Sequence, residues 1–178
     1  MTGVRKGLAK IEVALRWDPS RAGTPANDLD IVIAVYGAAD PHGTPVHLVH
    51  FGSRSPDGTI TLNRDSHTGQ GFGFDEVMTL ELDRMAAELR RVVVGVVIQR
   101  AGEGGTRKTF ADIEGAGVRI REGHTDLAAT GFDSIATATA ATVAEFTRDG
   151  SGGWSLAARL HGFDTEPEEF TRIMGAVR

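Results

Sequence analysis

Residues able to bind a cation concentrate in one stretch, residues 63–82, which has the sequence NRDSHTGQGFGFDEVMTLEL. Glycine alternates with larger residues from Gly69 to Phe74, and Asp65, Asp75 and Glu76 place carboxylates at the two ends of this loop. Glycine lets a backbone bend tightly and turn its carbonyls inward. Calcium binds hard oxygen ligands gathered around such a bend. The stretch therefore predicts a calcium site, and a glycine-rich surface loop with solvated carboxylates is the alternative.

A second group of carboxylates lies at the start of an apolar run, residues 28–36. Residues of a β-strand alternate between its two faces. One face carries four apolar side chains: Leu29, Ile31, Ile33 and Val35. Asp28 and Asp30 then lie together on the other face, roughly 7 Å apart from the strand rise. We expect these two carboxylates to line one polar site, with ordinary outward-facing residues at a strand's start as the alternative.

Other chemistries have weaker support in the sequence. His47 and His50 are three apart on a predicted strand, so they point to opposite faces and do not share a metal, whereas His67 beside Asp65 could join a site. The chain contains no cysteine, nucleophile elbow, P-loop or EF-hand loop. Although Asp65 and Glu76 could form a glycosidase-like carboxylate pair, no substrate cleft can be inferred from the sequence. We expect a protein that is not an enzyme.

Composition limits the class of protein. A chain of 178 residues is enough for one domain, and its 23 glycines favour short strands joined by turns. The net charge of -5 argues against a nucleic-acid partner, which requires clustered Lys and Arg. The longest apolar stretch, residues 92–98, is far shorter than the ~20 residues that cross a bilayer. We expect a cytoplasmic protein that does not bind membranes.

Alternating and β-branched runs predict the strands that would position these carboxylates. They cover residues 10–17, 28–36, 46–51, 59–62, 77–82, 91–99, 118–121, 125–131, 138–148 and 154–162. A short helix is expected at 83–89. Turns are expected at 55–58 and 149–153. Near the C-terminus, apolar residues at helical spacing, from Phe170 to Val177, predict an amphipathic helix with a capping box formed by Thr165 and Glu168.

Several of these segments together resemble the TerD family, the tellurium-resistance and stress-response proteins of bacteria. The resemblance rests on LRWD at 15–18, DLD at 28–30, SPDG at 55–58, TGxGxGxDE at 68–76 and GGW at 152–154. These motifs cover most of the chain and occur in the expected order. The central motif is the most specific because it combines regular glycine spacing with an acidic pair.

The resemblance implies a mainly β fold, a two-sheet β-sandwich that forms a single domain over residues 1–178 and binds calcium at one end. Five residues match the family's acidic positions and are its implied metal ligands: Asp28, Asp30, Asp65, Asp75 and Glu76. The implied function is a calcium-binding stress-response protein. Its implied partners are calcium and other tellurium-resistance or stress proteins.

The chain departs from the family pattern at two acidic positions, at Ser66, where the family commonly has Asn, and in a shorter N-terminal segment. The family usually has GDGDDE where residues 71–76 read GFGFDE, so Phe72 and Phe74 replace acidic residues. The remaining oxygens suffice for one calcium ion, which takes roughly 6 to 8 ligands, and the lost charge predicts weak binding. The alternative is a metal-free interaction module on the same fold. The two phenylalanines either fold back onto the protein where a second ion would lie, anchor a partner, or contact a membrane.

Overall fold

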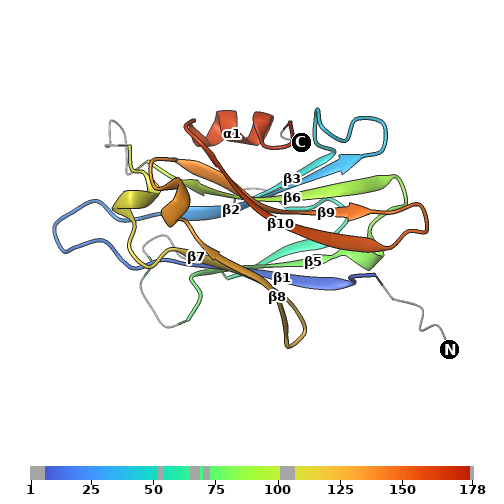
Figure 1. Cartoon of the computed structure of the whole chain (residues 1–178), viewed down its shortest axis with the longest axis horizontal. Coiled ribbons are helices and arrows are strands. Elements are labelled where there is room, and N and C mark those ends of the chain that lie inside the picture. The colour runs from blue at the N-terminus through green and yellow to red at the C-terminus, as the bar shows by residue number, and fades with distance from the viewer. Residues whose placement is uncertain (1–6, 52–53, 65–68, 70–72, 101–106, 177–178) are drawn as a thin grey trace.

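Two stacked β-sheets form the molecule, as the family resemblance implies (Figure 1). The computed structural model describes residues 7–51, 54–64, 69, 73–100 and 107–176. Each sheet has five strands, and all neighbouring strands within a sheet are antiparallel. In the described part of the chain, no helix has the length and apolar character needed to cross a membrane.

The first sheet, sheet A, has β1 at its centre. Its strands in spatial order are β4 (Ile60–Arg64), β5 (Glu76–Glu81), β1 (Lys10–Arg16), β7 (Gly117–Glu122) and β8 (Thr125–Gly131). The pairing of β1 with β5 sets Leu15 opposite Glu76. This register places Glu76, the second residue of the acidic pair in the glycine-rich motif, beside the end of β1.

The second sheet, sheet B, contains the most apolar strands. Its spatial order is β10 (Trp154–Phe163), β9 (Ala140–Arg148), β6 (Leu89–Ile98), β2 (Leu29–Gly37) and β3 (His47–Val49). Strands β2 and β6 are buried on both faces, so nearly every residue in them is inaccessible. Continuous apolar runs are expected for strands covered on both sides.

Apolar side chains between the sheets form the main core. Alternate residues of β1 and β2 point into it, including Ile11, Val13 and Leu15 from one sheet and Ile31 and Ile33 from the other. The predicted core face of β2 is thus confirmed. Asp28 and Asp30 are on the opposite side of that strand, since side chains alternate along it.

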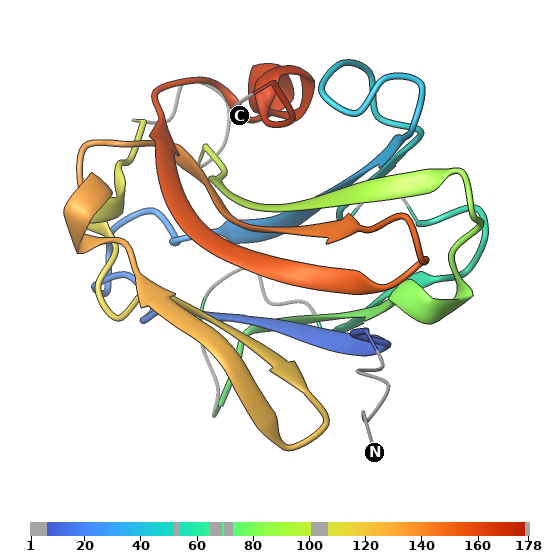
Figure 2. The ribbon, with the colours of Figure 1, turned by 45° about the vertical axis from the view of Figure 1, so that its right-hand side comes forward.

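Helix α1 (Pro167–Ile173) covers the outer face of sheet B, away from sheet A (Figure 2). Phe170 and Met174 pack there against the outer residues of β2 and β6 and are almost fully buried. A Cβ atom at Gly95 would lie 2.7 Å from Cε1 of Phe170, so glycine at this position lets the helix approach the sheet closely. The predicted amphipathic helix is confirmed over its described residues, and Val177 lies outside them.

The capping box predicted at the start of helix α1 is wrong. Glu166 is the N-cap residue of α1 and Pro167 follows it, so Thr165 and Glu168 do not form a capping box. Proline fixes its own φ near the helical value and favours the first helical position.

The helix expected at 83–89 is instead a single 3-10 turn, η1 (Leu82–Arg84), after which β6 begins at Leu89. Arg148 donates hydrogen bonds to the carbonyls of Leu82, Met85 and Ala86. This arginine satisfies carbonyl groups that a continuing helix would have bonded internally. Two further 3-10 turns lie in the connections between the sheets: η2 (Phe110–Asp112) between β6 and β7, and η3 (Asp133–Ile135) between β8 and β9.

Both predicted turns are present. The Gly58 amide donates to the Ser55 carbonyl at 3.1 Å, and Gly58 has a positive φ. The Asp149 amide donates to the Gly153 carbonyl at 2.9 Å, closing the connection between β9 and β10.

Replacing Phe170 with alanine should remove the main contact of α1 with sheet B. We expect the free energy of unfolding to fall by about 3–5 kcal/mol, the usual cost of deleting a buried phenylalanine. Urea denaturation measures this change. The exposed neighbour Glu169, replaced by alanine, serves as the control and should change stability by less than about 0.5 kcal/mol. A loss below about 1 kcal/mol for Phe170→Ala would contradict the docking role of the helix.

Candidate functional site

Glu76 is the acidic residue that joins the two sheets. It lies opposite Leu15, whose side chain is in the core, so Glu76 also points into the space between the sheets. Its side chain is fully buried, and its Oε1 accepts a hydrogen bond from the Ile31 amide of β2 at 2.8 Å. A carboxylate from sheet A thereby holds the backbone of sheet B.

The position of Ile31 explains why its amide needs this acceptor. Strand β3 pairs with β2 only as far as Val49, which lies opposite Ile33. Amides two residues apart along a strand point to the same side. The Ile31 amide therefore lies beyond the end of the β2–β3 ladder, where Glu76 supplies the acceptor. A buried amide without an acceptor would cost about 1–3 kcal/mol.

Asp75 holds the end of β1 in a similar way. Its exposed fraction is 2%, and its Oδ2 accepts a hydrogen bond from the Trp17 amide at 2.8 Å. Its own amide donates to the Leu15 carbonyl at 2.9 Å. The indole Nε1 of Trp17 donates in turn to the carbonyl of Asn27, the residue before Asp28, at 2.8 Å. Asp75 is thus connected through Trp17 to the start of β2.

The glycine-rich loop touches this connection at Gly69. Its φ is +75°, and a Cβ atom placed on it would lie 2.5 Å from Nε1 of Trp17. Gly73 also has a positive φ, +81°. Only glycine adopts such conformations without strain, so Gly69 and Gly73 serve the backbone bend as predicted, whereas Gly71 lies outside the described residues. Asp65 and Phe72 lie outside the described residues.

Asp30 points to the outer face of sheet B. Its exposed fraction is 1%, and its Oδ2 accepts a hydrogen bond from the side-chain amide of Gln99 at 2.7 Å. Asp30 lines a groove of about 360 Å³ between α1 and β3, together with apolar residues such as Val32 and Leu48. Asp28 is half-buried, and its carbonyl accepts the Gln99 amide at 2.8 Å.

The structure therefore brings two of the predicted ligands, Asp75 and Glu76, to the end of the sandwich where β1, β5 and β2 meet. Asp28 and Asp30 belong to the same strand start but lie on its other face. Within residues 7–51, 54–64, 69, 73–100 and 107–176, no group of three or more His, Cys, Asp or Glu side chains is placed to hold a metal ion by itself.

Phe74 folds back onto the protein. It is half-buried, and the guanidinium of Arg119 lies 4.2 Å from the centre of its ring. Arg119 is on the outer face of sheet A, between the buried residues Val118 and Ile120. A cation over an aromatic face is an attractive contact, and it puts a positive charge beside the glycine-rich loop.

Sequence reasoning missed three residues that position the site. Trp17, Asn27 and Gln99 hold Asp75 and the start of β2 through the hydrogen bonds above. The motif LRWD contains Trp17, and this tryptophan following an alternating strand was the available signal. Asn27 and Gln99 have no such local signal, because their roles depend on pairing across the fold.

Comparison with known proteins gives one family. The chain matches the model of the TerD domain over residues 1–172. It is 25% identical to the tellurium resistance protein TerD of Serratia marcescens over 162 residues, covering 88% of this chain and 82% of that protein. It is 27% identical to the stress response protein SCP2 of Bacillus subtilis (strain 168) over 185 residues, covering 95% of this chain and 91% of that protein.

A solved structure agrees closely with the fold. The crystal structure of a homologue of the telluride resistance protein TerD from Streptomyces coelicolor A3(2) superposes with a TM-score of 0.92 and 49% sequence identity. The match covers 97% of this chain and 100% of that chain.

Replacing Glu76 with alanine should remove the acceptor of the Ile31 amide and leave a cavity between the sheets. We expect the free energy of unfolding to fall by about 2–4 kcal/mol in excess chelator, where no metal contributes. Urea denaturation is the measurement. Glu76→Gln is the matched control because its amide oxygen can still accept the hydrogen bond, so it should lose less. Equal losses in the two variants would contradict the role of this hydrogen bond.

Proposed function

The chain belongs to the TerD domain family, and from this premise we propose that it is a stress-response protein of the tellurium-resistance type that binds one calcium ion and acts by binding, not by catalysis. The names of its relatives support the general function, since they include a tellurium resistance protein and a stress response protein. Calcium binding is supported separately, by the chemistry of the residues at the end of the sandwich.

The buried carboxylates are the observation that carries the calcium proposal. Asp75 and Glu76 are adjacent in sequence and almost inaccessible, and each uses one oxygen to accept a backbone amide. A carboxylate has two oxygens and about four lone-pair sites, so the hydrogen bond from the Trp17 amide leaves Asp75 with oxygen available for a metal. Hard carboxylate oxygens are the ligands that calcium prefers.

Charge favours a cation at this place. A buried carboxylate is costly unless a positive charge or several hydrogen bonds accompany it. In the described part of the chain, no Lys or Arg side chain forms an ion pair with Asp75. A bound calcium ion would supply the positive charge and would tie the glycine-rich loop to the strands beside it.

Asp75 and Glu76 would hold the ion at the end of the sandwich, whereas Asp28 and Asp30 lie on the other face of β2 and would not contact the same ion. Asp65, which lies outside the described residues, matches the remaining acidic position of the family. Because Phe72 and Phe74 replace acidic residues, we propose one weakly bound ion. Protein partners, such as other tellurium-resistance or stress proteins, would then bind a molecule whose loop is ordered by calcium.

A second candidate function is a metal-free interaction module on the same fold. The observation that favours it is the contact between Phe74 and Arg119. Phe74 stands where the family has an acidic residue, so a negative charge is absent there. The guanidinium of Arg119 lies over the ring of Phe74 and adds a positive charge. Both changes lower the attraction of the loop for calcium.

Calorimetric titration of calcium into chelator-treated protein distinguishes the two candidates. We expect saturable binding of one ion per chain, and loss of at least about tenfold in affinity for Asp75→Asn, which replaces a charged ligand by a neutral one. Asp126→Asn is the matched control, because Asp126 lies on β8 and pairs with Arg121 at 2.6 Å. If the wild-type protein gives no binding heat and calcium does not raise its melting temperature, the metal-free module is the better account.

Restoring an acidic residue at position 74 should strengthen calcium binding. We expect Phe74→Asp to raise the affinity by at least about tenfold, because it adds a charged oxygen ligand and removes the aromatic partner of Arg119. The same calorimetric titration measures this. Phe74→Ala separates the two effects, since it removes the ring without adding an oxygen. An affinity of Phe74→Asp no higher than that of Phe74→Ala would mean that position 74 does not face the ion.

A further inference from the structure

Strand β8 forms one edge of sheet A and, in Figure 2, lies below β10, the edge strand of sheet B. In the part of the chain that the structure describes, β8 pairs with β7 alone. Another chain can add to such an edge as a further strand, and natural edges are usually protected by lysine, proline or an irregular backbone. The sequence of β8, TDLAATG, contains no lysine, arginine or proline. Its register shift lies near the hairpin, so residues 128–131 pair regularly with residues 117–120 of β7.

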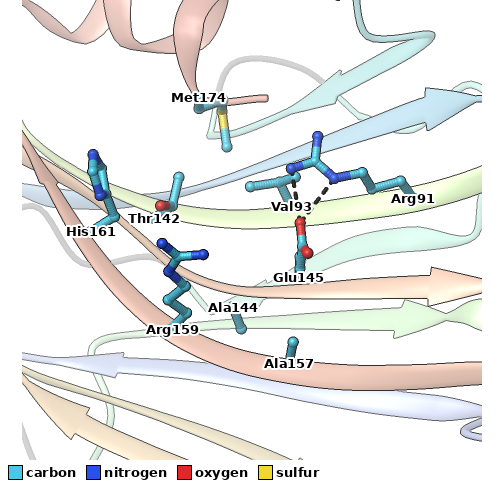
Figure 3. Close-up of a pocket in the computed structure, with 9 residues that line it drawn as sticks. All are labelled: Arg91, Val93, Thr142, Ala144, Glu145, Ala157, Arg159, His161 and Met174. Atoms are coloured by element: carbon cyan, nitrogen blue, oxygen red, sulfur yellow. Dashed lines mark hydrogen bonds and ion pairs between the residues drawn. The ribbon is translucent and has the colours of Figure 1, made fainter. Parts of the chain in front are cut away.

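The other edge strands are less suited to a further strand. Strand β3 has three residues, and the register of β4 against β5 is irregular within the strand. The register of β10 against β9 is irregular around Arg159, and Figure 3 shows the side chains of Arg159 and His161 on this strand. At the start of β10, the Leu8 amide donates to the Trp154 carbonyl at 3.0 Å, so the N-terminal segment already lies there. We therefore consider β8 as a binding edge.

A hollow lies on the inner face of β8, between the two sheets. Its volume is about 190 Å³, and a cavity of roughly 150 Å³ accepts a benzene molecule. Ala128 faces this hollow because it pairs with Ile120, whose side chain is in the core. The lining includes apolar residues of both sheets, such as Val118, Val143 and Leu160, and Arg159 borders it from β10. An added strand would place an apolar side chain here, next to the core.

A second hollow, of about 380 Å³, lies on the outer face of β8. Two arginines line it: Arg119, which pairs with Ala129 across β7 and β8, and Arg16 at the end of β1. Arg16 is exposed and, among the described residues, has no ion-pair partner. Nη2 of Arg119 lies 3.9 Å from Oε1 of Glu12, a long ion pair, and its guanidinium covers the ring of Phe74. This hollow therefore favours a negatively charged side chain, although the whole chain has a net charge of -5.

We propose that β8 binds an extended segment of a partner protein in which apolar residues alternate with Asp or Glu, adding it to sheet A as a further strand. Successive side chains of a strand point to opposite faces. The apolar side chains would enter the hollow between the sheets, and the carboxylates would meet Arg16 and Arg119, whose guanidinium groups form charge-assisted hydrogen bonds. Backbone hydrogen bonds to β8 supply further affinity. A second copy of this chain matches less well, because the carboxylate of its own β8, Asp126, already pairs with Arg121 at 2.6 Å.

A synthetic peptide in which valine alternates with glutamate tests the proposal. Excess chelator is present throughout, because none of the predicted calcium ligands lines either hollow. Hydrogen exchange of ¹⁵N-labelled protein, followed by NMR, locates the contact. We expect saturable binding and slower amide exchange within residues 128–131, since amides on the free side of β8 gain acceptors. The same peptide with methylated backbone amides keeps its side chains but cannot donate to β8, so it should bind at least about tenfold more weakly.

Charge variants test the outer hollow. Arg16→Gln should weaken binding of the valine-glutamate peptide by about threefold, and its combination with Arg119→Gln by about tenfold, because exposed ion pairs are lost. A valine-glutamine peptide should bind these variants as it binds the wild-type protein. Arg172→Gln is the matched control, since Arg172 is an exposed arginine of α1 that pairs with Glu168 at 3.0 Å. Ala128→Lys directs a charge into the inner hollow and should abolish binding. The melting temperature of each variant shows that it is folded.

Four results would overturn the proposal. They are the absence of saturable binding of the valine-glutamate peptide at millimolar concentration, equal binding of the methylated peptide, slower exchange confined to another edge strand, and an equal loss of affinity in Arg172→Gln and Arg16→Gln. Sedimentation of the protein without peptide adds a further test. A dimer whose β8 amides are protected from exchange would show that a second copy, and not a partner segment, occupies this edge.

Discussion

The hydrogen bond from the Ile31 amide to Glu76 is the constraint on which the site depends. It joins a buried carboxylate of sheet A to the backbone of sheet B, at the point where β3 no longer pairs with β2. Asp75, the preceding residue, binds the Trp17 amide and so fixes the end of β1. Two adjacent acidic residues therefore determine how three strands meet. Because carboxylate oxygens are also the ligands that calcium prefers, the residues that hold these strands are the same ones to which we assign the proposed calcium binding.

The sequence predicts the strands well because their alternation records which side chains face the core. It also contains a signal for the buried position of Glu76, which alternates with the core residues Met78 and Leu80. The helix expected after β5 is wrong because Arg148, distant in sequence, binds the carbonyls of that turn. Asn27 and Gln99 could not be identified for the same reason, since their roles depend on contacts between separate segments.

Helix α1 covers the part of sheet B that carries Asp30. Phe170 and Met174 attach the helix to the outer face of this sheet. The groove between α1 and β3 contains Asp30, near the start of β2. Packing of this short helix therefore affects the surroundings of Asp30, on the face of β2 opposite to the core residue Ile31.

The most direct test of the central claim is an NMR titration of the labelled, chelator-treated protein with calcium, following the amide signals of Ile31 and Trp17. These amides donate to Glu76 and Asp75, so a metal on the same carboxylates must change their environment. The account predicts that both signals shift together and saturate at one calcium ion per chain. Unchanged Ile31 and Trp17 signals at saturating calcium would show that Asp75 and Glu76 serve only to hold the strands.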